Sequence, residues 1–148
     1  RRISQWVAAG LRRANGRDFP RSDWNEQASL MLPAGRNGPA FLVTPNFYVI
    51  KRYNPSDVYA LFVGHVGDRI ANDSGGFRGA WGAVDDLLRS DVAAMQRALV
   101  EMGHDVGGAD GLAGYKTRRS IGRWQEVTNR AATCFPDRAS VAQLSKSP

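Results

Sequence analysis

The chain has 148 residues, 43% of them hydrophobic and 23% charged, which is the balance of a globular protein and excludes a disordered one. This length allows one ordinary domain or two small ones, and no apolar run reaches the roughly 18 residues of a membrane span. The 20 basic residues against 14 acidic ones give a formal net charge of +6, which suits nucleic acid, anionic lipid or a wall polymer, or else a solvated surface of mixed charge.

The first 52 residues contain short predicted elements separated by turns. Gly10 is a typical helix end, and the polar, turn-rich residues that follow are typical of a loop. Two short apolar runs flank the turn PAGRNGP, which predicts a pair of strands. In chain order, we expect a helix over 3–9, a loop over 14–27, strands over 29–32 and 40–44, and a short helix or bent segment over 46–52.

A strongly apolar helix is predicted after Pro55. Proline disfavours helical angles at Asn54, Ser56 stands at the N-cap position, and Asp57 places a negative charge in the first turn. Nearly every face is apolar from residue 58 to residue 70. Such a helix is normally buried between other elements, so burial is expected here.

Polar groups gather at the start of this helix, at Tyr53, Asn54 and Tyr59. An asparagine amide can hold an N-acetyl group or a water, and a tyrosine offers a sugar ring a flat apolar face and a hydroxyl. This end is therefore interpreted as the wall of a cleft. The alternative is a turn with core packing, which is the commoner use of these residues.

The rest of the chain is predicted as a linker followed by three helices. The Gly-rich residues 71–79 form the best linker candidate. Ser90 is the expected N-cap of the first helix, Gly103 ends that helix, and Asp137 caps the third. The apolar residues expected on the inner faces are Val92, Met95, Leu99, Met102, Ile121, Trp124, Val141 and Leu144.

The loop between the first two of these helices, DGLAGYKT, is expected to shape the fold. Asp110 and Gly111 should make the turn, and Gly114 should allow close backbone approach. The hydroxyl of Thr117 should satisfy a free amide at the start of the next helix, which is predicted over 116–127.

Four separated segments, in order, resemble the MltB-type membrane-bound lytic murein transglycosylases: SQWVAAGLRRANG, LPAGRNGPAFLVTPNF, KRYNPSDVYALFVGHVGDRI and DGLAGYKTRRSIGRWQ. The third looks like the Y-N-x-S-x-x-Y-A segment that closes that family's lysozyme-like domain. The resemblance implies a mainly α fold with a small β element (α+β). It predicts an incomplete lysozyme-like part over 1–72, a linker over 73–89 and a three-helix peptidoglycan-binding domain over 90–148.

As the resemblance implies, these enzymes cut the MurNAc–GlcNAc bond of peptidoglycan without hydrolysis and leave 1,6-anhydro-MurNAc ends. One Glu protonates the leaving oxygen, so it needs an apolar site that raises its pKa. The chain's glutamates, Glu26, Glu101 and Glu126, are all predicted to lie at the surface. We therefore expect the catalytic Glu upstream and this chain alone to be inactive. The residues that the family motif assigns to substrate binding are Tyr53, Asn54 and Tyr59, with Ser56 as a cap.

Other kinds of site have little support in the sequence. His65 is expected to pack in the core and His104 to lie in a turn, and neither has a second ligand at metal spacing. Cys134 is the only cysteine and cannot form a disulfide within the chain. No metal, cofactor or nucleic-acid partner is expected.

The expected partner is the glycan strand of peptidoglycan, bound by a monomer in the periplasm or cell envelope. Membrane association would need an N-terminal anchor outside this chain. Two alternatives stay open. One is a peptidoglycan-binding module without chemistry. The other is a basic nucleic-acid-binding domain, because Arg118, Arg119 and Arg123 in a three-helix unit could mimic a helix-turn-helix.

Overall fold

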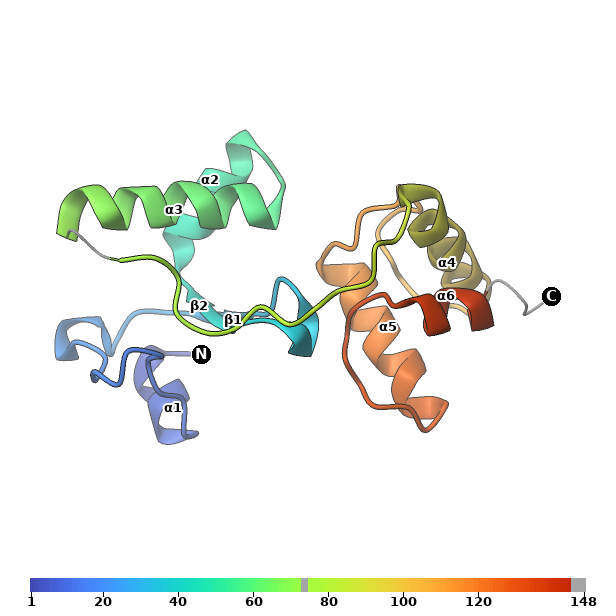
Figure 1. Cartoon of the computed structure of the whole chain (residues 1–148). Coiled ribbons are helices and arrows are strands. Elements are labelled where there is room, and N and C mark those ends of the chain that lie inside the picture. The colour runs from blue at the N-terminus through green and yellow to red at the C-terminus, as the bar shows by residue number, and fades with distance from the viewer. Residues whose placement is uncertain (73–74, 145–148) are drawn as a thin grey trace. The chain divides into compact units, whose positions relative to one another are not determined.

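The computed structural model describes residues 1–72 and 75–144, and these are mainly helical with one two-stranded sheet (Figure 1). The predicted mainly α fold with a small β element is confirmed. The chain divides into two compact units: unit 1 is Arg1–Pro33 with Pro39–Ala80, and unit 2 is Ala34–Gly38 with Trp81–Pro148. The predicted division into a catalytic part, a linker and a wall-binding part stays a prediction. Residues 73–74 of that linker lie outside the described residues.

Each unit has its own set of elements. The elements of unit 1 are α1 (Ile3–Ala8), a 3-10 turn (Arg21–Asp23), β1 (Ser29–Met31), β2 (Phe41–Val43), α2 (Pro45–Tyr53) and α3 (Asp57–Asn72). The elements of unit 2 are a 3-10 turn (Gly35–Asn37), α4 (Arg89–Glu101), α5 (Tyr115–Val127) and α6 (Arg138–Leu144).

The first helix ends as Gly10 predicts. Gly10 has a φ of +96°, and its backbone N–H donates to the Val7 carbonyl at 2.9 Å. The Leu11 N–H donates to the Trp6 carbonyl at 3.0 Å. This pair of bonds is the Schellman arrangement, which satisfies the last carbonyls of a helix and turns the chain away from the helix axis.

The loop that follows α1 returns along the start of the same helix. The backbone N–H groups of Ile3 and Ser4 donate to the carbonyls of Glu26 and Trp24, at 2.9 and 3.1 Å. These N–H groups would otherwise lack partners, because the first turn of a helix has none. The predicted loop is thus held by backbone bonds at its end, which local sequence signals do not show.

The sheet and the core of unit 1 lie together. Strands β1 and β2 pair antiparallel, with Leu30 opposite Leu42, so the predicted pairing is confirmed. The buried apolar cluster joins the sheet to both following helices. Its members are Met31, Val43, Phe47 and Ala60.

The expectation that α3 is buried between other elements is wrong for this chain. Ala60 is its only buried side chain among those described. Val58, Phe62 and Ile70 are 66%, 62% and 82% exposed. The reason is that α2 covers one side of α3, and the other described residues of unit 1 leave much of the remaining surface open (Figure 1).

A short returning segment covers a further patch of α3. The Phe77 ring stacks on His65, with centroids 4.0 Å apart, and meets the Phe41 ring edge-on at 5.3 Å. His65 is half-buried in this contact. It therefore packs against one aromatic ring in a partly exposed cluster, and the expected place in the core is wrong.

Unit 2 has a core of side chains from α4, α5 and α6, which confirms most of the predicted inner faces. Met102 is the exception: it is the C-cap residue of α4 and is 45% exposed. The buried members of the unit 2 core are Val92, Met95, Ala98, Leu99, Val106, Ile121, Trp124 and Leu144, with Val141 partly buried beside them.

The caps in unit 2 follow the prediction in part. Ser90 lies inside α4, so its prediction as N-cap is wrong; the N-cap is Leu88, whose N–H donates to the Asp91 carboxylate at 3.0 Å. Gly103 follows the helix with a φ of +85°, as expected of a helix end. Asp137 accepts the Ser140 N–H at 2.6 Å, so the cap of α6 is confirmed.

A buried glutamine holds the DGLAGYKT loop against α4. The Gln96 side chain is 0% exposed; its amide N–H donates to the Thr117 hydroxyl and the Leu112 carbonyl at 3.0 and 3.1 Å. Its carbonyl oxygen accepts the Gly111 N–H at 2.7 Å. Burying an amide is favourable only when its groups are paired, and this one is fully used.

Two expectations for this loop need correction. The Thr117 hydroxyl donates to the Val106 carbonyl at 3.1 Å and so ties the first turn of α5 to the α4–α5 connection rather than capping α5. Close approach occurs at Gly111, which has a φ of +78° and lies against the Arg89 backbone, whereas Gly114 has open space beside it. Spacing alone could not tell which glycine meets another segment.

Acid is expected to weaken unit 2. A hydrogen bond from the Leu112 N–H lowers the pKa of Asp110, and one from the Lys116 side chain lowers the pKa of Asp105. Because both folded values lie below unfolded values near about 4, this stabilisation is complete above that pH and is lost as the pH falls through the folded values. The urea concentration at the midpoint of unfolding, followed by circular dichroism, should be lower at pH 3 than at pH 6.

The matched controls are Asp110→Asn and Asp105→Asn, each of which should flatten this pH dependence. An Asp110→Asn, Asp105→Asn double variant whose urea midpoint falls as steeply as that of the parent would contradict the assignment. The effect should be small, since both carboxylates are solvated and their attractions are screened.

Candidate functional site

The candidate site lies at the corner between α2 and α3. Helix α2 ends at Tyr53, and Asn54 leaves it with extended angles, φ −139° and ψ 119°, as expected for a residue before proline. The Asn54 side-chain oxygen accepts the Ser56 N–H at 2.9 Å, and the Ser56 hydroxyl accepts the Tyr59 N–H at 3.3 Å. Ser56 is therefore the predicted cap of α3, and the two bonds hold the corner in one conformation.

The three predicted binding residues lie at this one corner. The rings of Tyr53 and Tyr59 have centroids 6.1 Å apart and are tilted by 30°. Tyr53 is 85% exposed, while Asn54 and Tyr59 are half-buried. Two adjacent rings with an amide between them in the chain form a surface that solvent can reach, so a ligand can reach it too. Their role in substrate binding stays a prediction.

Asn54 divides its polar atoms between two tasks. Its side-chain oxygen is used by the corner, as described above. Its NH₂ group makes no hydrogen bond with another described residue and can donate outward. An amide held by its oxygen presents its N–H in a fixed direction, which suits recognition of a carbonyl such as that of an N-acetyl group.

An ion pair beneath the corner was not predicted. The Lys51 ammonium lies 2.5 Å from the Asp57 carboxylate, and these side chains are 26% and 13% exposed. Lys51 is in the last turn of α2 and Asp57 in the first turn of α3, where each helix dipole favours that charge. In the sequence, these two oppositely charged residues are six positions apart, with Pro55 between them. No helix or strand periodicity links such residues.

The glutamates have surface positions, as expected. Glu26 follows the 3-10 turn of unit 1, Glu101 is the last residue of α4, and Glu126 lies near the end of α5; all three are exposed. A general acid at neutral pH needs an apolar, desolvated setting, which an exposed carboxylate lacks. The presence of a catalytic Glu upstream stays a prediction. Among the described residues, no helix has the length and apolar character needed to cross a membrane.

Residues 1–68 match the family described as the transglycosylase SLT domain. The chain is also similar to SltB3 from Pseudomonas aeruginosa in two crystal structures, one in complex with NAG-anhNAM-pentapeptide and one with NAG-NAM-pentapeptide. Each match has 40% sequence identity and a TM-score of 0.80, and covers 97% of this chain but 38% of the SltB3 chain. A comparison with curated proteins gave no match.

These matches support the resemblance to lytic transglycosylases and a lysozyme-like SLT fold. The chain spans about two fifths of the length of the SltB3 chains. The narrower assignment to membrane-bound enzymes of the MltB type stays a prediction.

Proposed function

Because residues 1–68 match the transglycosylase SLT domain, we propose that this chain is part of a lytic transglycosylase that acts on peptidoglycan in the cell envelope. The enzyme cleaves the MurNAc–GlcNAc bond without water and leaves 1,6-anhydro-MurNAc ends. The anhydro ligand in one SltB3 structure supports this class of product. The catalytic Glu belongs to a segment upstream, and this chain alone is inactive.

The role of this chain is to supply one wall of the saccharide groove. The observation that carries this proposal is the α2–α3 corner, where Tyr53, Asn54 and Tyr59 lie together, open to solvent and held by local bonds. The tyrosine rings provide apolar faces for sugars, and the Asn54 NH₂ provides a directed donor. Neither group can transfer the proton that the reaction needs at neutral pH, which is consistent with an acid from elsewhere.

The exposed apolar side of α3 fits the same proposal. Val58, Phe62 and Ile70 would form part of a core if an upstream segment covered them, as expected of a helix that is apolar nearly all round. The share of SltB3 outside the match leaves ample chain for such a cover. The chain by itself should therefore bind a hydrophobic dye more strongly than the longer protein does.

Removing the exposed ring of the corner should weaken glycan binding. We expect Tyr53→Ala to reduce affinity for a soluble NAG-NAM tetrasaccharide about fivefold, measured by titration calorimetry on the chain. Stability should change by less than about 0.5 kcal/mol because the side chain is 85% exposed. The matched control is Tyr48→Ala, which removes another exposed tyrosine of α2 and should leave affinity unchanged.

Product analysis and retention on insoluble peptidoglycan separate the alternatives. The longer protein should release 1,6-anhydro products, while this chain should release none. A longer protein that binds peptidoglycan but releases no such product would favour the binding module without chemistry. Displacement of the chain from peptidoglycan by DNA, together with unchanged affinity of Tyr53→Ala for the tetrasaccharide, would favour the nucleic-acid-binding domain.

A further inference from the structure

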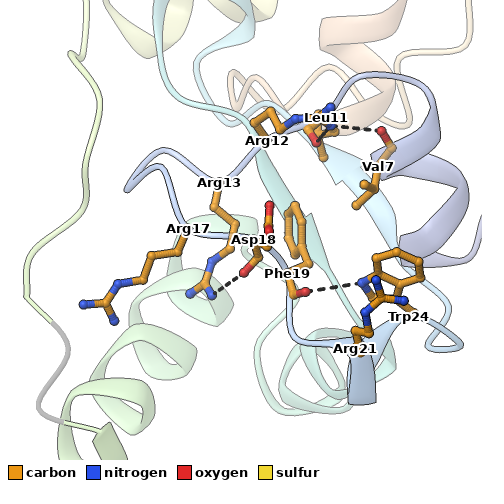
Figure 2. Close-up of a pocket in the computed structure, with 9 residues that line it drawn as sticks. All are labelled: Val7, Leu11, Arg12, Arg13, Arg17, Asp18, Phe19, Arg21 and Trp24. Atoms are coloured by element: carbon orange, nitrogen blue, oxygen red, sulfur yellow. Dashed lines mark hydrogen bonds between the residues drawn. The ribbon is translucent and has the colours of Figure 1, made fainter.

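A hollow lies in unit 1 beside α1, away in sequence from the α2–α3 corner (Figure 2). Its volume is about 260 Å³. Half-buried apolar residues and exposed arginines line it together. The residues that line it are Val7, Leu11, Arg12, Arg13, Arg17, Asp18, Phe19, Arg21 and Trp24.

Hydrogen bonds hold the backbone around this hollow. The Schellman end of α1 turns the chain at Gly10, and the Arg12 guanidinium donates to the carbonyls of Val7 and Leu11 at 3.0 and 2.9 Å. On the opposite side, the Trp24 indole N–H donates to the Phe19 carbonyl at 3.3 Å. Figure 2 shows the Arg12 bond to Val7, the Trp24 bond to Phe19 and the Phe19 ring between them. These hydrogen bonds fix the backbone on both sides of the hollow.

The arginines differ in how much of their donor capacity the fold uses. Arg13 makes one long bond, 3.4 Å, to the Asp18 carbonyl, and Arg21 lies over the Trp24 ring at 4.7 Å. The Arg17 guanidinium makes no hydrogen bond or ion pair with another described residue. A guanidinium has five donors, so these three keep most of them for a ligand.

We propose that this hollow binds a carboxylate of the peptidoglycan stem peptide, as a site distinct from the glycan groove. The inference rests on the proposed function, which supplies peptidoglycan as the substrate. Arg17 and Arg21 hold the carboxylate by charge-assisted bonds. Phe19 and Trp24 contact the apolar side chains beside it, and the Asp18 carboxylate accepts a peptide N–H.

The shape and the mixed lining of the hollow favour a peptide over other anions. A nucleic acid needs a row of cations that follows successive phosphates, whereas these arginines line one small hollow. A free phosphate would gain nothing from the two aromatic rings. An acidic lining residue among four basic ones also opposes a polyanion, but it suits a ligand that carries both a carboxylate and N–H donors.

The test uses the sugar-free pentapeptide L-Ala-D-Glu-L-Lys-D-Ala-D-Ala and the same peptide with its carboxylates amidated. Titration calorimetry on the whole chain should show that the double variant R17Q/R21Q binds the first peptide about tenfold more weakly than the parent does. The control R69Q/R97Q loses the same charge at exposed positions outside the hollow and should bind like the parent. Amidation should weaken binding to the parent by a similar factor.

Circular dichroism checks that each variant folds, and Arg17→Gln alone repeats the test if loss of the Arg21–Trp24 contact unfolds the double variant. No binding of the free peptide, or equal affinity in parent and variant, would overturn the inference. Tighter binding of a DNA duplex or of phosphatidylglycerol vesicles through the same arginines would overturn it as well. The tetrasaccharide titration does not depend on these arginines. A negative result with the peptide would therefore leave the proposed function standing, and a negative result with the tetrasaccharide would count against the proposed function alone.

Discussion

Gly111→Ala is expected to lower the free energy of unfolding of unit 2 by about 3 kcal/mol or more, enough to unfold a marginal unit. A residue other than glycine is disfavoured at a φ of +78° by roughly 1–2 kcal/mol. The added Cβ would also collide with the Arg89 carbonyl oxygen and the stem of its side chain. Backbone cannot yield as a flexible side-chain end can, so the loop would have to move away from α4.

The movement would also break a buried hydrogen bond. The Gly111 N–H donates to the side-chain oxygen of Gln96, which is 0% exposed. Leaving that oxygen without a partner adds a desolvation cost to the strain. Circular dichroism in urea, with amide hydrogen exchange on α4 and α5, would measure the loss.

The connection between α4 and α5 also provides the control. Gly108 has open space beside it and does not have a positive φ, so Gly108→Ala should be neutral or slightly stabilising. If Gly111→Ala and Gly108→Ala gave the same urea midpoint, the close approach of the loop to Arg89 would be wrong.

Asn54→Asp is expected to reduce the turnover of the longer enzyme about a hundredfold, which corresponds to about 2.7 kcal/mol of lost transition-state stabilisation. The variant keeps the side-chain oxygen that accepts the Ser56 N–H, so the corner keeps its conformation. It loses the NH₂ donor that the proposal aims at the substrate, and it adds a negative charge. A site that loses a directed donor in the transition state loses rate more than binding.

Two measurements separate this effect from a structural one. The thermal midpoint of Asn54→Asp should stay within the error of the parent, because an acidic side chain just before α3 also suits the helix dipole. Asn54→Ala should lose turnover and some stability together, since it removes the cap-like oxygen as well. Full turnover in Asn54→Asp on isolated peptidoglycan would remove Asn54 from the groove.

Local signals located most of the elements correctly. Gly10 and Gly103 ended helices because a positive φ costs glycine little, and Ser56 and Asp137 capped helices because their oxygens reach the first free N–H groups. The strand pair followed from two short apolar runs on either side of a turn, and the inner faces of α4 and α5 followed from a period-3.6 apolar pattern. These features depend on residues a few positions apart, so the chain's path in space does not alter them.

The candidate site was found by resemblance to a family motif. Its local geometry was predicted from the residues that start the helix. Tyr53, Asn54 and Tyr59 lie within seven positions around one proline, so a single turn had to bring them together. The ion pair of Lys51 with Asp57 and the arginine hollow were not predicted. Both join side chains across a turn or a returning loop, where no periodic spacing applies.

By itself, the sequence determined the helices, most of their ends, the small sheet and the corner with its tyrosines and amide, because each is set mainly by neighbouring residues. Only the tertiary structure decided which surfaces are covered. It left the apolar side of α3 open, buried Gln96 as the partner of a distant loop, and chose Gly111 over Gly114 for the close approach. Burial and long-range pairing depend on where remote segments run, and composition and spacing do not contain that information.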